Sequence, residues 1–282
     1  MVRNRMRLAW LGGTLSVLAS LPIAAAPAIT PLEVDVKLVI ATDVSRSIND
    51  DEALVQRQGT ADVFLDPDVV KAIQSGSLGR IAVAMLDWTI VRDKESAAAL
   101  AAKIRAIPRT GGERTSISGA LQRAMLMLDD SDRYIVAEKK VIDVSGDGPN
   151  NDGMSLQHVH DTTKDNGTIV NGLPIMDLDS DGYYEDLDKY YDACVVAGKG
   201  AFLIVVKAFK DFGTAMRRKL VLEISANETQ IRQTLRELDS NPLLKTIAAT
   251  NVSPGVQLLL KQPDKTYPGG CDKYGGYGVN GG

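Results

Sequence analysis

The sequence predicts an α/β fold, a doubly wound and mostly parallel sheet flanked by helices, of the Rossmann-like class. Five apolar runs of strand length are separated by segments in which apolar residues recur at helical spacing. Strands that alternate with helices of these lengths are typical of a parallel sheet covered on both faces. With 282 residues and 44% hydrophobic composition, the chain is long enough for one well-buried domain with additions.

The predicted elements follow one another regularly up to Ser225. The expected strands are short, mostly apolar runs: Val34 to Thr42, Arg80 to Thr89, Lys140 to Ser145, Thr168 to Met176 and Ala201 to Ala208. The expected helices have apolar residues three and four positions apart: Glu52 to Leu65, Ser96 to Ile107, Ile117 to Leu128, Ser155 to Lys164, Leu187 to Val196 and Asp211 to Ile224. Right-handed crossovers then bring the loops that follow the parallel strands to one edge of the sheet.

After Ser225 the pattern changes. Residues 226–261 are expected to form a helical C-terminal extension, with one helix over Glu228 to Leu238 and a shorter one over Leu243 to Ala249. Residues 262–282 contain seven glycines and three tyrosines, and we expect a flexible tail unless Cys271 ties it back.

Residues 1–26 have the three-part pattern of a secretory signal peptide. Arginines at positions 3, 5 and 7 precede the apolar stretch Leu8 to Ile23, and Ala24-Ala25-Ala26 follows as a cleavage site. A retained membrane anchor is the weaker interpretation, because Gly12-Gly13 and Pro22 interrupt the apolar stretch. No later apolar stretch is long enough to span a bilayer, so we expect a periplasmic or secreted protein.

The charge of the mature chain argues against nucleic acid as a partner. Removal of the three arginines of the signal from the 32 basic residues leaves 29 against 36 acidic residues, a formal net charge of about −7. Nucleic-acid-binding surfaces are usually basic. The sequence does not indicate an oligomeric state.

Oxygen-bearing side chains occur at three places where loops of the predicted sheet should meet. Asp43, Ser45 and Ser47 follow the first strand at alternate positions, so in an extended segment they point to one side. Thr115 lies in a glycine-bearing loop before a helix, and Asp147 lies in the turn after the strand that ends at Ser145. Such oxygens suit a hard cation such as Mg²⁺.

The pattern Asp43-x-Ser45-x-Ser47, then Thr115, then Asp147, resembles the metal-ion-dependent adhesion site of von Willebrand factor A-type domains. The resemblance implies that this domain spans residues 31–225 and that these five side chains bind Mg²⁺, or Mn²⁺ or Ca²⁺, directly or through water. Arg46 departs from the small residue common in such domains, and its guanidinium either crowds the metal face or contributes to anion binding. Four further runs resemble a group of secreted bacterial proteins with this domain and no assigned function: Gly112 to Leu121, Val141 to Asn151, Asn171 to Met176 and Arg217 to Ser225.

This resemblance implies a metal-dependent adhesion module, not an enzyme, that recruits an acidic side chain of a protein partner to the cation. One alternative is a metal-dependent hydrolase such as a phosphoesterase, which needs a general base or a second metal. Another alternative is a purely structural ion.

A second acidic segment resembles a calcium-binding loop. Its candidate ligands are Asp177, Asp179, Asp181, Tyr183 through its carbonyl, and Asp188, with Gly182 for the sharp turn. Asp188 replaces the usual bidentate glutamate, and a strand rather than a helix precedes the loop. A solvated acidic turn is the alternative.

Cys194 and Cys271 are the only cysteines, and they are 77 positions apart. In an oxidising compartment we expect a disulfide between them, which would stabilise the fold by about 4 kcal/mol in the chain-entropy model. The alternative is a buried thiol at Cys194 and a free thiol in the tail.

Overall fold

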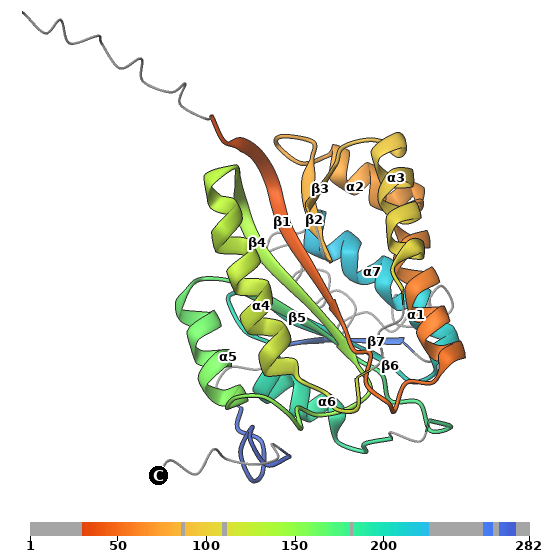
Figure 1. The fold of residues 1–282 in the computed structure, drawn as a ribbon, viewed down its shortest axis with the longest axis vertical. Coiled ribbons are helices and arrows are strands. Elements are labelled where there is room, and N and C mark those ends of the chain that lie inside the picture. The colour runs from red at the N-terminus through yellow and green to blue at the C-terminus, as the bar shows by residue number, and fades with distance from the viewer. Residues whose placement is uncertain are drawn as a thin grey trace, which may run out of the picture. The chain divides into compact units, whose positions relative to one another are not determined.

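The computed structural model describes residues 30–85, 88–108, 112–180, 183–225, 256–261 and 265–274. The predicted signal peptide and residues 226–255 lie outside this part of the chain. The described residues form a seven-stranded sheet in the order β3-β2-β1-β4-β5-β6-β7 (Figure 1). The strands are β1 (Leu32–Thr42), β2 (Ile81–Ala84), β3 (Trp88–Val91), β4 (Ile135–Gly146), β5 (Ile169–Pro174), β6 (Phe202–Val206) and β7 (Val256–Leu260). The five central strands are parallel and the two edge strands antiparallel, which confirms the predicted fold class.

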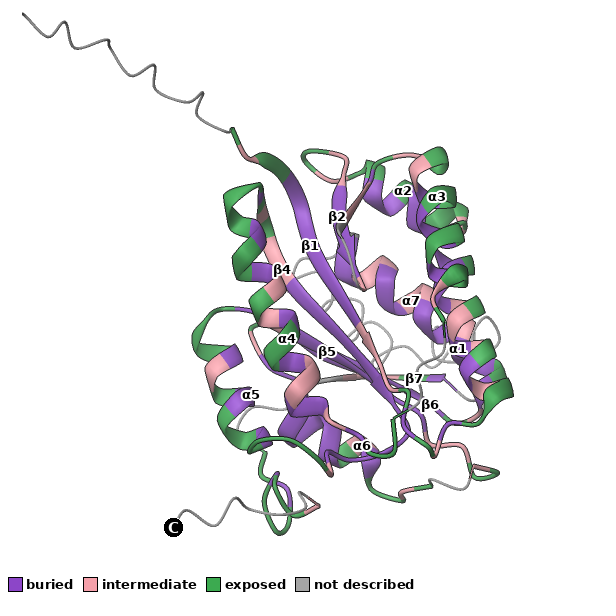
Figure 2. Ribbon diagram, in the orientation of Figure 1, coloured by how far each residue is buried: buried purple, intermediate pink, exposed green. Residues whose placement is uncertain are grey.

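The central pair, β1 and β4, places the candidate metal ligands. These strands pair in parallel from Leu32 opposite Ile135 to Thr42 opposite Ser145, and both are buried over most of their length (Figure 2). Since they end side by side, the chain that follows β1 meets the chain that follows β4. A hydrogen bond of 2.8 Å from the Asp43 amide to the Ser145 carbonyl continues the ladder into the loops.

Helices cover both faces of the sheet. One layer contains α1 (Asp50–Val63), α2 (Pro67–Gln74), α3 (Lys94–Ala106) and α7 (Phe212–Ser225), with the 3₁₀ helix η3 (Phe209–Asp211) before α7. The other contains α4 (Ile117–Asp130), α5 (Leu156–Asp165), α6 (Leu187–Tyr190) and the π-helix η2 (Tyr191–Val195), with the 3₁₀ helix η1 (Ser131–Arg133) after α4. Each layer packs on its own apolar cluster. No helix within the described ranges is long and apolar enough to cross a membrane.

Helix α1 begins directly after the first metal motif because Asn49 caps it. The Asn49 side chain accepts from the Glu52 amide at 3.0 Å, and the Glu52 carboxylate accepts from the Asn49 amide at 2.8 Å, which makes a capping box. Three acidic residues in the first turn also favour the positive end of the helix dipole. The motif therefore lies in a short segment fixed at both ends.

Two predictions about individual elements were wrong. The run Arg80 to Thr89 is not one strand but parts of two, β2 and the antiparallel β3, because a mostly apolar run without glycine or proline does not reveal where a hairpin turns. Helix α2 was not predicted, although Asp66 caps it through the Asp68 amide at 2.8 Å and Pro67 stands at its first position.

The C-terminal part also differs from the prediction where it is described. Within the expected helical extension 226–261, Val256–Leu260 is strand β7, paired antiparallel with β6. This strand forms one edge of the sheet. It was missed because a short, mostly apolar run fits a buried helix as well as a strand. Within the expected flexible tail 262–282, residues 265–274 form turns that pack against the second helix layer. Those ten positions are therefore not flexible tail.

Candidate metal centre

The structure brings the five predicted ligands together at the carboxyl edge of the sheet. Ser45 Oγ lies 3.0 Å from Ser47 Oγ, and Ser47 Oγ donates to Asp147 Oδ1 at 2.9 Å. Thr115 Oγ1 donates to Asp43 Oδ2 at 3.2 Å, and the Ser45 amide donates to Asp43 Oδ1 at 2.8 Å. Loops separated by about a hundred positions thus form one cluster of oxygen atoms.

Two asparagines that the sequence analysis did not select hold the Thr115 loop. Asn151 Oδ1 accepts from the Thr115 amide at 2.8 Å, and the Asn151 amide donates to the Thr115 carbonyl at 2.9 Å. Asn150 Oδ1 accepts from the Ser118 amide at 2.9 Å, in the first turn of α4. The Asn-Asn pair after Pro149 gave only a general turn signal, because its partners lie more than thirty positions away.

Gly146 and Tyr191 form the inner wall of the site. A Cβ atom at Gly146 would lie 3.0 Å from Asp43 Cβ, Asp43 Oδ2 and Tyr191 Oη, a tight contact, so these groups pack closely against the glycine backbone. The Tyr191 hydroxyl is buried and has no hydrogen-bond partner in the described structure. Burial, together with the nearby Asp43 and Asp147 carboxylates, raises the pKa of Tyr191 above its usual range. Sequence reasoning missed this residue, because it comes from η2.

The two carboxylates of the site lack a positive neighbour among the described residues. Burial raises the pKa of Asp43, and burial followed by repulsion from Asp43 raises the pKa of Asp147 to about 6. Asp147 Oδ2 is buried and accepts no hydrogen bond from the described residues. Arg46 is exposed and makes no ion pair with either aspartate. An orphaned anionic oxygen beside a second carboxylate is the environment that a bound cation would stabilise.

The donor set fits a hard cation. Two carboxylates and three hydroxyls offer only oxygen atoms, which Mg²⁺ and Ca²⁺ prefer. Within the described ranges no group of three or more His, Cys, Asp or Glu side chains is placed to hold a metal ion, so hydroxyl ligands are essential to this site. The five residues therefore fit the predicted type of ion.

The acidic loop is only partly described. Asp177 Oδ1 accepts from the Asp179 amide at 3.1 Å, and Asp177 Oδ2 accepts from the Phe209 amide at 2.8 Å. Asp181 lies outside the described residues, Tyr183 is exposed, and Asp188 is in the first turn of α6. Both Asp177 oxygens are thus engaged by backbone amides, and calcium binding here stays a prediction.

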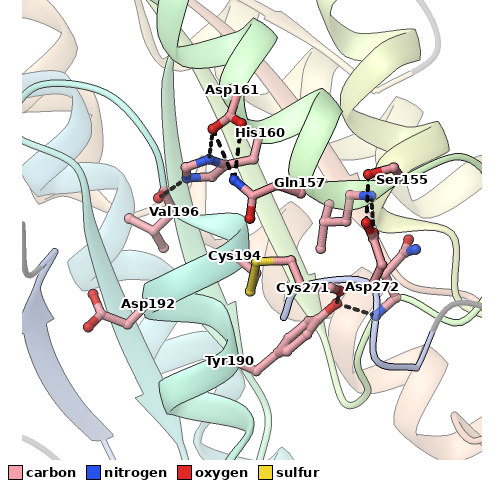
Figure 3. The surroundings of a disulfide bond; sticks show 12 residues. Ser155, Gln157, His160, Asp161, Tyr190, Asp192, Cys194, Val196, Cys271 and Asp272 are labelled. Carbon is pink, nitrogen blue, oxygen red and sulfur yellow. Dashed lines mark hydrogen bonds and ion pairs between the residues drawn. A yellow bond between two sulfur atoms is a disulfide. The ribbon is translucent and has the colours of Figure 1, made fainter. Parts of the chain in front are cut away.

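The predicted disulfide is present, and it ties the tail to the second helix layer (Figure 3). Cys194 on η2 is bonded to Cys271, with a Cα–Cα distance of 5.4 Å. Tyr190 Oη donates to the Cys271 carbonyl at 2.9 Å. Asp272 accepts from Ser155 Oγ and from the Leu156 amide, both at 2.6 Å, at the start of α5.

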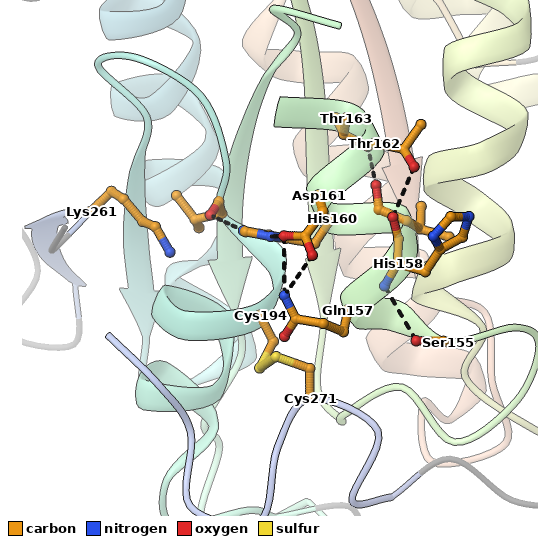
Figure 4. Close-up of polar contacts among 12 residues, drawn as sticks. Ser155, Gln157, His158, His160, Asp161, Thr162, Thr163, Cys194, Lys261 and Cys271 are labelled. Atoms are coloured by element: carbon orange, nitrogen blue, oxygen red, sulfur yellow. Dashed lines mark hydrogen bonds and ion pairs between the residues drawn. A yellow bond between two sulfur atoms is a disulfide. The ribbon is translucent and has the colours of Figure 1, made fainter. Parts of the chain in front are cut away.

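His160 joins α5 to the segment that follows η2 (Figure 4). The ring of His160 is buried, with Nε2 3.2 Å from the Val196 carbonyl and Nδ1 3.2 Å from Asp161 Oδ1. His158 is exposed on another side of the helix. The two histidines of the chain therefore do not form a site together.

This sheet order, with these five side chains at its carboxyl edge, is consistent with the von Willebrand factor A-type arrangement that the sequence resembles, with an adhesion-type cluster of candidate metal ligands. The chain belongs to the family described as "Protein of unknown function (DUF1194)", whose model matches residues 33–228. No curated protein matches the chain.

Several solved structures are partly similar to this chain. Proximal thread matrix protein 1 from the mussel byssus is 18% identical, with a TM-score of 0.48, over 69% of this chain and 49% of its own. A form of that protein described as having a zinc-occupied MIDAS motif is 15% identical, with a TM-score of 0.46, over 68% of this chain and 46% of its own. Manganese-loaded Plasmodium vivax TRAP is 14% identical, with a TM-score of 0.40, over 66% of this chain and 73% of its own. The chain thus spans about half the length of the mussel protein.

Proposed function

We propose that this chain is an exported, metal-dependent protein-binding module. Asp43, Ser45, Ser47, Thr115 and Asp147 hold a divalent cation, Mg²⁺ in the first instance with Mn²⁺ or Ca²⁺ as alternatives. A protein partner then offers an acidic side chain to the bound ion. The observation that carries this proposal is the pair of carboxylates, Asp147 buried and Asp43 half-buried, which converge with three hydroxyls and have no positive partner in the described structure.

The chemistry of the donor set explains why the partner should be acidic. The two carboxylates formally balance the charge of a divalent ion, but the other three side-chain donors are neutral hydroxyls, and five donors leave at least one of the six positions around Mg²⁺ to another oxygen ligand. A divalent ion bound there supplies positive charge at a surface loop and attracts an incoming carboxylate. Specificity then depends on the surrounding contacts.

The rim of the site is accessible to a partner. Val44 is 41% exposed, and Arg46 is exposed beside it. Residues 112–114 are exposed on the neighbouring loop, which the Gly112 amide joins to the Val44 carbonyl at 2.9 Å. An apolar side chain and a guanidinium beside the ion offer the contacts that an acidic peptide segment would use.

Hydrolysis is the second candidate, and the described surroundings favour binding instead. A hydrolase needs a general base within hydrogen-bonding reach of the reacting water. His160 faces the Val196 carbonyl and His158 is on the surface of α5. Asp143 is buried in an ion pair with Lys219, at 2.7 Å. Asp43 and Asp147 are the metal ligands themselves.

The test has two stages. Isothermal titration with Mg²⁺ should give binding to the mature protein, and Asp147→Ala should remove most of it while Asp165→Ala, at an exposed position, has no effect. Capture from the native envelope with Mg²⁺ and with chelator should then yield a partner that is lost with chelator and with Asp147→Ala. Metal binding that persists in Asp147→Ala would contradict the site. Metal binding that affects only thermal stability would make the ion structural.

A further inference from the structure

A groove of about 290 Å³ lies beside the metal loops at the β2 side of the sheet. β1 pairs with β2 only from Val36 opposite Ile81 to Val39 opposite Ala84, so Ile40 to Thr42 extend beyond the end of β2. Helices α1 and α4 cover opposite faces there, and Figure 1 shows β1 between them. The groove is the space between these helices where the sheet stops, and Ile107 and Pro108, after α3, also line it.

The inner part of the groove is apolar but contains two polar atoms without partners. Ala53, Met85, Ala124 and Met127 are among the apolar side chains that line it. Gln56 is only 2% exposed, and its Nε2 has no hydrogen-bond partner within the described residues. Thr42 is half-buried, and its buried Oγ1 atom also has no partner within the described residues. A buried donor without an acceptor is destabilising. These atoms are therefore available to a ligand that enters the groove.

Two guanidinium groups also line this groove. Arg57 comes from α1, one residue after Gln56, and is half-buried, whereas Arg123 comes from α4 and is exposed. Neither makes an ion pair or side-chain hydrogen bond with any other described residue. Since the mature chain is acidic overall, two unpaired arginines beside an apolar groove are a local exception. An anionic head group with an apolar body has the complementary chemistry.

We propose that this groove binds a small amphipathic carboxylate, with its apolar body between α1 and α4 and its carboxylate at Arg57 and Arg123. The volume limits the size of the ligand. At the 30 Å³ or so that one water occupies in the liquid, 290 Å³ holds about ten non-hydrogen atoms. Octanoate has that size and is the probe of choice.

The experiment is a titration of metal-stripped full-length mature protein, so that a carboxylate cannot bind through the cation. Octanoate should bind with a Kd of about 1 mM or tighter, a value typical of a ligand of this size. Octanol, which has the same apolar body without the charge, and octylammonium, which has the opposite charge, should each bind at least about tenfold more weakly.

Variants separate this groove from the rest of the surface. Arg57→Gln and Arg123→Gln should each weaken octanoate binding by about tenfold, and Ala120→Leu, which narrows the groove, should weaken octanoate and octanol alike. Arg133→Gln, an exposed arginine on η1 without an ion pair among the described residues, is the matched control and should change nothing. Equal binding of octanoate and octanol, an effect of Arg133→Gln as large as that of Arg57→Gln, or no octanoate binding up to about 10 mM would each overturn the proposal.

Discussion

Removal of the Lys219 ammonium is the most demanding test of how α7 is held to the sheet. Lys219 Nζ lies 2.7 Å from Asp143 Oδ2 on β4 and 2.6 Å from Glu223 Oε1, one turn further along α7. Asn171 on β5 donates to the same Glu223 oxygen at 2.8 Å, and its own Oδ1 accepts from the Phe202 amide at 3.0 Å. One buried network therefore joins α7 to three strands.

The expected loss of stability in Lys219→Met follows from the burial of the three charged side chains. Lys219 and Asp143 are fully buried, and Glu223 is 4% exposed. In Lys219→Met the two carboxylates lose their shared cation, and loss of one partner of a buried ion pair costs about 3–5 kcal/mol. Replacement of all three charges, as Asp143→Asn, Lys219→Met and Glu223→Gln together, should recover most of that loss, because no uncompensated charge remains.

The same network should make stability depend on pH. Burial, opposed by Lys219, raises the pKa of Glu223 from 4.5 to about 7, and burial also raises the pKa of Asp143. Because the folded state holds the Glu223 proton more tightly than the unfolded state, this contribution to stability is complete below pH 4.5. It is lost as the pH rises through about 7, and the total loss is about 3 kcal/mol at 1.36 kcal/mol per pKa unit.

Urea unfolding followed by circular dichroism at pH 5, 7 and 8 would measure these effects. Lys219→Met should unfold at lower urea than the wild type at every pH, with the larger difference at pH 8. Lys210→Met, an exposed lysine on η3, is the matched control and should leave the midpoint unchanged. If Lys219→Met behaves like Lys210→Met, or if its stability rises from pH 5 to pH 8, the assigned charges of this network are wrong.

Three further predictions concern the disulfide and the two candidate metal sites. Substitution of Cys194 and Cys271 by serine should lower the free energy of unfolding by about 4 kcal/mol in the chain-entropy model, and an unchanged urea midpoint would contradict a stabilising bond. Asp147→Asn removes the orphaned anionic oxygen, so Mg²⁺ affinity should fall by at least about tenfold in calorimetric titration, with the far-UV spectrum unchanged. Calcium should still bind, at millimolar Kd or tighter, to the Asp43→Ala, Asp147→Ala protein and be lost on Asp179→Ala; no calcium event in that background would leave a solvated acidic turn.

The candidate metal ligands could be selected from the sequence because each of them lies in a short pattern directly after a strand or before a helix. Alternation along an extended segment places Asp43, Ser45 and Ser47 on one side, and parallel strands place the Asp147 loop at the same edge. Tyr191 could not be selected in this way. It reaches the site from a π-helix, and nothing in its neighbourhood distinguishes it from a tyrosine on an ordinary amphipathic helix.

The edge strand β7 could not be predicted either, because it too depends on contacts with distant parts of the chain. An edge strand is defined by its partner rather than by its own composition, and β7 pairs with β6 across more than fifty positions of chain. The run Val256–Leu260 is apolar, but so are many short helical segments of that length. In the sequence, Cys271 was the single indication that the residues near it would be ordered, because the hydrogen bonds of Asp272 to Ser155 and Leu156 join positions more than a hundred residues apart.

The π-helix η2 links these features, because its five residues include both Tyr191 at the candidate metal site and Cys194 in the disulfide. Immediately before it, Tyr190 Oη accepts from the Asn150 amide at 3.3 Å and donates to the Cys271 carbonyl at 2.9 Å. Asn150 in turn holds the first turn of α4, directly after the Thr115 loop. The tail is thus connected to two of the three loops that supply candidate ligands, through one tyrosine and one covalent bond. The order of the tail and the placement of the ligand loops therefore depend on the same short segment of chain.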